Sequence, residues 1–274
     1  MKRILTVQDI SCVGKCSLTV ALPVLSAMGV ETAVLPTSVL STHTAFPAPV
    51  VQDLTGLLVP MADHWQRIGA KFDGVYTGYL GSEQQVDTVL QMVRRFAPQM
   101  LFVDPVMGDN GRLYSGLDSA YIQKMRALCA KADVLVPNMT EACFLTDTPY
   151  REDGGEAFIG KLLEKLTAMG CGIVLITGVS FEPGKTGVMG CNGATGDRFY
   201  YGQDKLPESY HGTGDVFSSV CAGALLLEKP WQAAVKLAAD FTAECIRVTM
   251  EETRDKRFGV CFEKALPGLI KGLE

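Results

Sequence analysis

The sequence predicts an α/β fold in which helices cover both faces of a mostly parallel central sheet, within a single domain spanning residues 1–274. Short apolar runs rich in β-branched residues alternate with longer helical patterns, as in a chain of strand–helix–strand units. The apolar runs are nearly continuous, which is typical of strands buried on both faces. The predicted strands are residues 4–7, 32–35, 74–76, 101–104, 134–136 and 173–177, and the predicted helices between them are residues 17–28, 83–96, 120–131 and 156–169.

The pattern changes after residue 177. Two strand-like runs, residues 187–191 and 198–201, are separated by a turn rich in Asn and Gly, which predicts an antiparallel hairpin. Three further helices are predicted at residues 216–227, 232–251 and 262–270. The segment 38–49 is rich in Ser, Thr, His and Pro and interrupts the alternation, so we predict a short flap over the active site there.

Composition and charge exclude several classes of protein. The chain is 47% hydrophobic and carries a formal net charge of −5, which argues against nucleic acid or an anionic membrane as a partner. No apolar run is long enough to span a membrane, and the N-terminus becomes polar too early for a signal peptide, so a cytoplasmic protein is expected. The nine cysteines form no Cys-x-x-Cys pair, and we expect buried, reduced thiols rather than disulfides or a zinc site.

Polar side chains follow most of the predicted strands. Ligands of an open parallel sheet bind beyond the carboxyl ends of its strands, so these side chains are expected to converge on one site. In chain order they are Asp9 and Ser11, then Thr77, Gly78 and Tyr79, then Asp104 and Asp109, then Asn138 and Glu141, and finally Thr177 and Gly178.

The run Gly212, Thr213, Gly214 and Asp215 stands directly before an apolar helical segment. Unpaired N–H groups and the macrodipole make a helix N-terminus attractive to anions, and glycines allow an anion to approach the backbone. Asp215 is placed to take a proton from a hydroxyl that attacks such an anion, which predicts phosphoryl transfer to an alcohol. The alternative, that Asp215 only complements the helix dipole, does not explain two glycines.

Carboxylates near this anion site predict a magnesium site. Asp104, Asp109 and Glu141 supply hard oxygen ligands of the kind that Mg²⁺ prefers. A structural alternative remains for Asn138 and Glu141, which are spaced as the two ends of a capping box. A P-loop at Gly184-Lys185-Thr186 is excluded because position 179 lacks the required glycine.

Two histidines lie near the predicted site. His43 belongs to the predicted flap, and His211 adjoins the first glycine of the anion site. Either a ligand contact or simple packing explains a single histidine, and both readings stay open for His211.

With these motifs the chain resembles the pyridoxal kinase branch of the ribokinase-like superfamily, over nearly its whole length. The run 104–109 reads Asp-Pro-Val-Met-Gly-Asp, as in that family, and Asn138 with Glu141 is similar to its Asn-x-x-Glu motif for Mg²⁺ and phosphates. The resemblance implies that Thr177 and Gly178 approach the nucleotide phosphates. It also implies contacts with the acceptor ring from Ser11, His43, Thr44 and Tyr79.

The family resemblance implies ATP-dependent phosphorylation of the 5′-hydroxymethyl group of pyridoxal, pyridoxine or pyridoxamine, in salvage of vitamin B6 to pyridoxal 5′-phosphate. Mg²⁺ is the implied cofactor, a monovalent cation is a further candidate, and a cytoplasmic homodimer is the implied assembly. Thr42 and Ala45 replace the family's usual Asn and Gly in the flap, which leaves the preferred vitamer open.

Two other functions remain as alternatives. A hydroxymethylpyrimidine kinase of thiamine synthesis shares this architecture, but such enzymes usually carry Gly-Gly-Ala-Gly-Ile-Gln where this chain has Cys-Val-Gly-Lys-Cys-Ser at residues 12–17. A nucleotide-binding relative without turnover is the other alternative, and the complete set of carboxylates argues against it.

Overall fold

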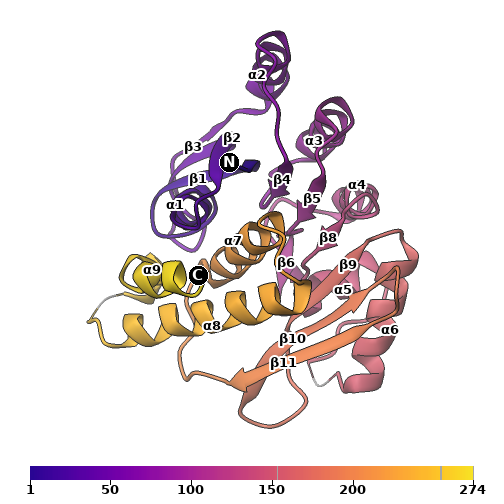
Figure 1. Ribbon diagram of the computed structural model, residues 1–274, viewed down its shortest axis with the longest axis vertical. Helices are drawn as coiled ribbons and strands as arrows, with labels where there is room; N and C mark the ends of the chain where they lie inside the picture. The colour runs from indigo at the N-terminus through magenta and orange to yellow at the C-terminus, as the bar shows by residue number, and fades with distance from the viewer. Residues whose placement is uncertain (153, 254, 274) are drawn as a thin grey trace. The chain divides into compact units, whose positions relative to one another are not determined.

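The long N-terminal strand β1 (Arg3–Val13) is the centre of the first of two compact units into which the chain divides. The computed structural model describes residues 1–152, 154–253 and 255–273 (Figure 1). The first unit combines Met1–Gly78 with Leu206–Glu274, and the second is Tyr79–Lys205. Each unit is described by itself below.

The first unit contains four strands in the order β4-β1-β2-β3. β1 is parallel to both β2 (Glu31–Thr42) and β4 (Gly74–Thr77), so Ile4 lies opposite Thr32 on one side and Gly74 on the other. β3 (Val51–Asp53) pairs antiparallel with the end of β2. The registration of β1 against β2 shifts between Gln8 and Ile10, just before the polar end of β1.

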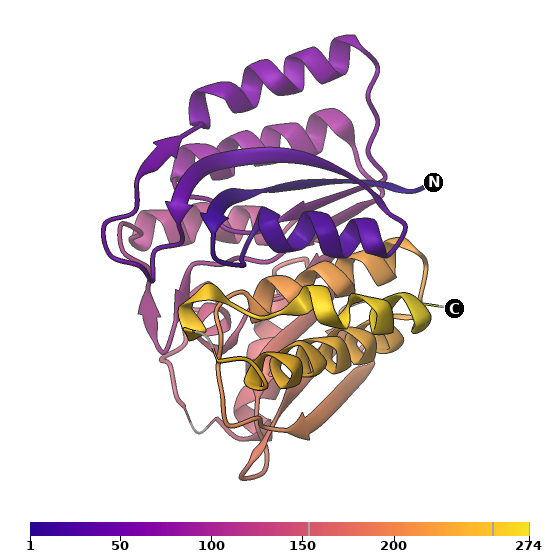
Figure 2. The same ribbon diagram turned by 90° about the vertical axis from the view of Figure 1, so that its left-hand side faces the viewer.

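Helices lie on both faces of these strands. Figure 2 shows α2 (Thr55–Arg67) on one side of β1 and β2, and α1 (Leu18–Ala27) on the other side. α7 (Thr213–Leu226) packs on α1 and on α8 (Trp231–Met250), which in turn contacts α9 (Phe262–Lys271). Most of α7 is buried, which explains its nearly uniform apolar sequence after Asp215.

The second unit contains five strands in the order β11-β10-β9-β8-β5. The strands β5 (Met100–Val103), β8 (Val134–Leu135) and β9 (Ile173–Val179) are parallel, and β10 (Lys185–Asn192) and β11 (Arg198–Asp204) add an antiparallel hairpin. Two short strands, β6 (Gly108–Asp109) and β7 (Arg112–Leu113), form a separate ribbon.

Four helices of this unit contact one another in sequence order. They are α3 (Glu83–Phe96), α4 (Ser119–Cys129), α5 (Met139–Leu145) and α6 (Glu156–Ala168). α5 and α6 also pack against β9.

The predicted α/β class, the parallel strands and the hairpin are confirmed, and three details were wrong. β1 extends to Val13, so Asp9 and Ser11 lie within the strand and not after it. The first part of the predicted flap continues β2 to Thr42, because its β-branched residues pair with the end of β1. The helices α2 and α5 were not predicted: Pro60 interrupts the pattern of the first, and the second is only seven residues long.

The cysteines are free thiols, as predicted, but they are not all buried. Seven are buried, whereas Cys12 is exposed and Cys16 is half-buried. Cys12 is near the exposed end of β1, and Cys16 lies in the turn that follows this strand. Within the described part of the chain, no helix combines the length and the apolar character needed to cross a bilayer. The single domain stays a prediction.

Candidate active site

The Gly-Thr-Gly-Asp run forms the first turn of α7. Gly212 is the N-cap residue with a left-handed φ of 79°, and its carbonyl accepts the N–H of Val216 at 2.9 Å. The N–H groups of Thr213, Gly214 and Asp215 therefore have no partner within the helix. No side chain of the described residues caps this end. The turn thus has the backbone geometry of an anion site, with a carboxylate attached.

Gly212 is required here because a side chain would have no space, and because its φ is left-handed. A Cβ at this position would overlap the carbonyl oxygen of Lys15. Gly259, at a φ of 77°, is close to the same oxygen, since its Cβ would lie 2.9 Å away. The turn of residues 12–17 therefore packs directly on the start of α7, with backbone against backbone.

The thiol of Cys16 shows which groups gather at this contact. Burial raises its pKa most, and the nearby carboxylates of Asp215 and Asp9 raise it further. Hydrogen bonds with Ser11 and Ser17 act in the opposite direction. The end of β1, the following turn and the start of α7 thus bring two carboxylates and two hydroxyls around one thiol.

Asp9, one of the polar residues expected to converge on the site, is a member of this cluster. It is only 4% exposed, and the hydroxyl of Ser11 donates to its Oδ2 at 3.1 Å. Burial raises its pKa, while hydrogen bonds with Ser17 and Ser11 lower it. The available signal was a carboxylate that follows the apolar run of residues 4–7.

His43 follows β2 directly and is buried beside the same cluster. Its Nδ1 accepts the N–H of Ala45 at 3.3 Å, so its Nε2 carries the proton and donates to the carbonyl of Arg257 at 2.6 Å. Its ring lies 4.6 Å from that of His211 and 5.0 Å from that of Phe46, measured between centroids. The structure therefore brings the two predicted histidines together.

The neighbours of His43 are also held in place. A Cβ on Gly14 would lie 2.6 Å from the His43 ring, so this glycine permits the close approach of the turn after β1. Phe46 packs on Phe258, and the guanidinium of Arg257 lies 5.0 Å from the Phe46 ring. Thr44 is exposed, and its predicted contact with the acceptor ring stays a prediction.

In the second unit, Asn138 and Glu141 form the capping box of α5. The Oδ1 of Asn138 accepts the N–H of Glu141 at 3.0 Å, and the Oε2 of Glu141 accepts the N–H of Asn138 at 2.8 Å. The same pair holds the segment after β5: Oε1 of Glu141 accepts the N–H of Met107 at 2.9 Å, and Nδ2 of Asn138 donates to the carbonyl of Gly108 at 2.8 Å. The structural alternative for both residues is therefore confirmed, and it leaves a role in binding open.

Asp104 and Asp109 flank the segment that this capping box holds. Asp104 is buried at the end of β5, and Asp109 is exposed and accepts the N–H of Asn110 at 2.8 Å. Among the described residues, no group of three or more His, Cys, Asp and Glu side chains is arranged to hold a metal ion by itself. Two carboxylates fit Mg²⁺ that keeps several waters and is bound mainly by phosphates.

The remaining predicted residues of this unit lie at the ends of strands. Thr177 forms a bridge with Asn138, and its N–H donates to the carbonyl of Pro137 at 3.0 Å. Gly178 is exposed at a φ of 73°, with open space around the position of a Cβ. Tyr79 is half-buried near Tyr121, whose hydroxyl donates to the carbonyl of Leu80 at 2.8 Å.

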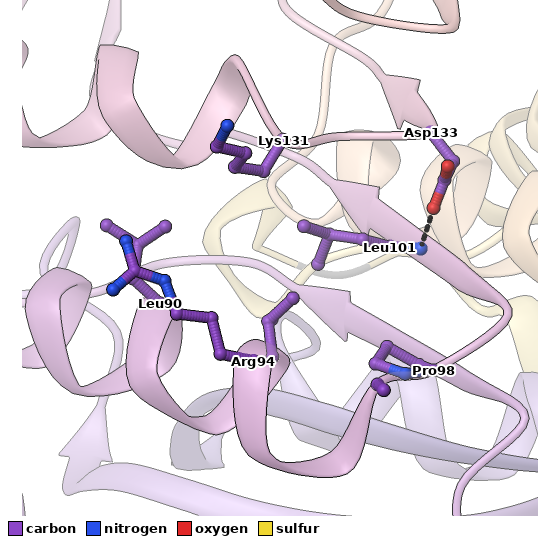
Figure 3. A pocket seen from close by; sticks show the side chains of 8 residues that line it. Leu90, Arg94, Pro98, Leu101, Lys131 and Asp133 are labelled. Atoms are coloured by element: carbon purple, nitrogen blue, oxygen red, sulfur yellow. Dashed lines mark hydrogen bonds between the residues drawn. The ribbon is translucent and has the colours of Figure 1, made fainter.

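A surface hollow of about 460 Å³ lies elsewhere in the second unit (Figure 3). The residues lining it include Leu90, Arg94, Lys131 and Asp133. The carboxylate of Asp133 accepts the N–H of Leu101 at 2.7 Å, so it serves the backbone there. None of the predicted site residues lines this hollow, and we assign it no part in the site.

Glu141 makes stability depend on pH. Burial raises its pKa from 4.5 to about 7, although hydrogen bonds from the backbone lower it. Between these values the folded state holds a proton that the unfolded state has lost, so the stability contributed by Glu141 falls as the pH rises. Glu141→Gln should remove this loss, which is on the order of 3 kcal/mol across the window.

Denaturant unfolding between pH 4 and 8, in buffer without divalent cations, measures this effect as the difference between wild type and variant. Glu156→Gln, an exposed glutamate in the first turn of α6, is the matched control and should follow the wild type. If the unfolding free energies of the wild type and of Glu141→Gln depend on pH in the same way, the pKa of Glu141 is not raised in the folded state.

Comparison with known proteins shows that this chain is similar to small-molecule kinases. The family model described as phosphomethylpyrimidine kinase matches residues 61–258. A crystal structure of pyridoxal kinase from Lactobacillus plantarum has a TM-score of 0.92 and 35% identity, covering 99% of this chain and 97% of that chain.

Two further relatives extend this comparison. A Bacteroides thetaiotaomicron protein, provisionally described as a phosphomethylpyrimidine kinase and crystallised with pyridoxal, has a TM-score of 0.94 and 39% identity, covering 98% of this chain and 95% of that chain. The pyridoxal kinase of Dictyostelium discoideum is 28% identical over 239 residues, covering 81% of this chain and 77% of that protein.

Proposed function

Since the chain belongs to the phosphomethylpyrimidine kinase family, we propose that it transfers the γ-phosphoryl group of ATP to the 5′-hydroxymethyl group of a vitamin B6 vitamer. The observation that carries this proposal is the first turn of α7, where an uncapped helix N-terminus and Asp215 stand together. The similarity to the Lactobacillus plantarum pyridoxal kinase, and to a relative crystallised with pyridoxal, favours a pyridine alcohol as the acceptor.

In this proposal Asp215 accepts the proton of the attacking hydroxyl. The N–H groups of Thr213, Gly214 and Asp215, with the N-cap Gly212, stabilise the negative charge that develops on the transferring phosphoryl group. Preorganised donors of this kind need no rearrangement during the reaction, because the contact of Gly212 with the carbonyl of Lys15 already holds the turn.

The acceptor ring is proposed to lie against the residues at the ends of β1 and β2. Ser11 and His43 are buried there, His211 packs on His43, and Thr44 and Tyr79 complete the predicted contacts. Their role is to hold the hydroxyl in line with the phosphoryl group and to exclude water as a competing acceptor.

The nucleotide contacts are proposed from the family resemblance. Asn138, Thr177 and Gly178 would approach the phosphates, and Asp104, Asp109 and Glu141 would hold Mg²⁺ through its waters. When bound, Mg²⁺ would neutralise part of the negative charge of the phosphates. A monovalent cation is a further candidate, and a homodimer in the cytoplasm is the setting that we propose.

Hydroxymethylpyrimidine kinase is the second candidate function. The description of the family model that matches residues 61–258 favours it. The turn at residues 12–17 speaks against it, because Cys-Val-Gly-Lys-Cys-Ser replaces the glycine-rich run that is usual in those enzymes.

A product assay tests the proposed function. With Mg-ATP and pyridoxal, the protein should form pyridoxal 5′-phosphate and ADP in equal amounts, measured by chromatography of the two products. ADP formation without pyridoxal 5′-phosphate would mean that water is the acceptor, and formation of neither product would contradict the proposal.

A further inference from the structure

The strand β11 is an unprotected edge in the second unit. It stands at the end of the strand order, and among the described residues no strand pairs with its outer side (Figure 1). It has seven residues, contains no proline or lysine, and pairs with β10 without a bulge. By contrast, the edge strand β3 of the first unit has only three residues. Edges that avoid association are usually short, bulged or interrupted by such residues, so β11 is open to another strand.

Two hydrogen bonds at the ends of the hairpin show which backbone groups of β11 face outwards. The N–H of Asn192 donates to the carbonyl of Asp197 at 2.9 Å, and the N–H of Lys205 donates to the carbonyl of Gly184 at 2.8 Å. Hydrogen-bonded pairs alternate along an antiparallel ladder, so every second residue of β11, beginning with Phe199, bonds to β10. The outward N–H and C=O groups belong to the other residues, which are Arg198, Tyr200, Gly202 and Asp204.

The sequence of β11 is complementary to its own reverse. When two copies of the strand run antiparallel with Tyr201 on the two-fold axis, Arg198 of each copy lies opposite Asp204 of the other. Tyr200 then lies opposite Gly202, so a large side chain faces a position without one. In this registration all the outward-facing residues oppose one another, and each such pair forms the hydrogen bonds of an antiparallel ladder.

Other registrations lose this match. A shift of two residues in either direction is the smallest that keeps the hydrogen-bonding pattern, and it places both Arg198 and Asp204 opposite uncharged residues. An unshifted parallel arrangement places like charges side by side. The charge pattern of the strand therefore favours one arrangement of two copies.

The two charged side chains are accessible for this contact. Arg198 pairs with Glu164 on α6, and Asp204 pairs with Lys185 on β10, each at 2.8 Å. Both pairs lie at the surface, where an ion pair is weak, and the Asp204 side chain is 87% exposed. Each charge can therefore face a second partner across the strand edge.

We propose that β11 is an interface between two copies of this chain, which pair edge to edge and antiparallel about Tyr201. The strands of the two copies then form one continuous sheet. The homodimer implied by the family resemblance leaves open which surfaces meet, whereas this inference names the surface from the chain's own residues. It does not depend on the proposed phosphoryl transfer.

Charge reversal on one side of the pair tests this interface. In a dimer of Arg198→Asp two carboxylates face each other twice, and in a dimer of Asp204→Arg two guanidinium groups do so. Each variant alone should have a dissociation constant about tenfold higher than wild type, because attraction becomes repulsion at both copies of the pair. Analytical ultracentrifugation over a range of protein concentrations measures these constants.

A mixture of the two variants should associate again. In the mixed dimer every carboxylate faces a guanidinium group, so the dissociation constant should return to within about threefold of the wild-type value. The matched control is Arg247→Asp, which reverses a charge paired with Glu244 on α8 and should associate like wild type. Thermal unfolding confirms that each variant is folded before association is compared.

Cross-linking at the two-fold axis tests the registration. In Tyr201→Cys the two new thiols would lie on residues whose Cα atoms are about 4.5 Å apart, which is within the range of a disulfide. In the control Gln203→Cys they would lie about 13 Å apart along the strands. Mild oxidation should therefore link two copies of the first variant much faster than two copies of the second, with wild type as the background for the native cysteines.

Several outcomes would contradict the proposed interface. They are a wild type that stays monomeric, a dimer that does not respond to charge reversal, no gain on mixing the two variants, and equal cross-linking at positions 201 and 203. Formation of pyridoxal 5′-phosphate is measured separately, so failure of this interface leaves the proposed function standing, and failure of the proposed function leaves the interface standing.

Discussion

Replacing Asp215 with asparagine is expected to lower kcat by about 10²–10⁴-fold, because the amide cannot accept the proton of the attacking hydroxyl. The fold should survive, since asparagine has the shape of aspartate and the interaction of Asp215 with the helix dipole is worth only about 0.3–1 kcal/mol. Steady-state kinetics with pyridoxal and Mg-ATP measure the effect, and the KM values should change little.

The control for this variant is Asp240→Asn, which removes a carboxylate from the surface of α8 and should leave kcat unchanged. A loss of less than tenfold for Asp215→Asn would remove Asp215 from the role of base. The interpretation of the start of α7 as an anion site would not be affected.

The Gly212→Ala substitution is expected to reduce kcat/KM by about 10²-fold or more, because displacing an aligned reactive group by as little as 1 Å has an effect of this size. The new Cβ would overlap the carbonyl oxygen of Lys15, and a φ of 79° disfavours any residue with a Cβ. The start of α7 must therefore shift away from the turn of residues 12–17. Stability should also fall, by about 1–3 kcal/mol.

Gly214→Ala is the matched control for stability. Nothing lies within 4 Å of a Cβ at Gly214, and a helical alanine is favoured over glycine by up to about 1 kcal/mol. Thermal unfolding should thus show a loss for Gly212→Ala and none for Gly214→Ala. Unchanged stability and kcat/KM in Gly212→Ala would mean that the contact with Lys15 does not fix the turn.

The parts of the site that the sequence predicted are those with a local pattern. The run from Gly212 to Asp215 contains its own glycines and carboxylate, and the structure places it in the first turn of a helix. Asn138 and Glu141 have the spacing of a capping box, and they form one. In both cases these interactions connect residues at most four apart, so the local pattern contained the needed information.

The parts that the sequence did not predict depend on distant residues. The need for a glycine at 212 comes from the carbonyl of Lys15, almost two hundred residues earlier. The burial of Asp9, its hydrogen bond with Ser17 and its electrostatic interaction with His43 likewise exist only in the folded chain. Likewise, the carbonyl of Arg257 that hydrogen-bonds to His43 is brought near only by the folded chain.

In the predicted flap, contacts with distant residues override a local sequence pattern. Its Ser, Thr and His composition predicted a loop over residues 38–49, yet residues up to Thr42 continue β2. The pairing of Val39 and Leu40 with Ile10 and Ser11 overrides the local polar composition. Only the segment from His43 onward remains outside the strand, and there Phe46 packs on the distant Phe258 as well as on His43.

A competition between pyridoxal and hydroxymethylpyrimidine for phosphorylation by Mg-ATP tests the central claim most directly. The ratio of the two kcat/KM values is measured in one reaction, from the amounts of the two phosphorylated products. We predict a clear preference for pyridoxal, because the chain is similar to the pyridoxal kinase from Lactobacillus plantarum and to a relative crystallised with pyridoxal. A preference for the pyrimidine would contradict the assignment of the acceptor, and no transfer to either compound would contradict the kinase function itself.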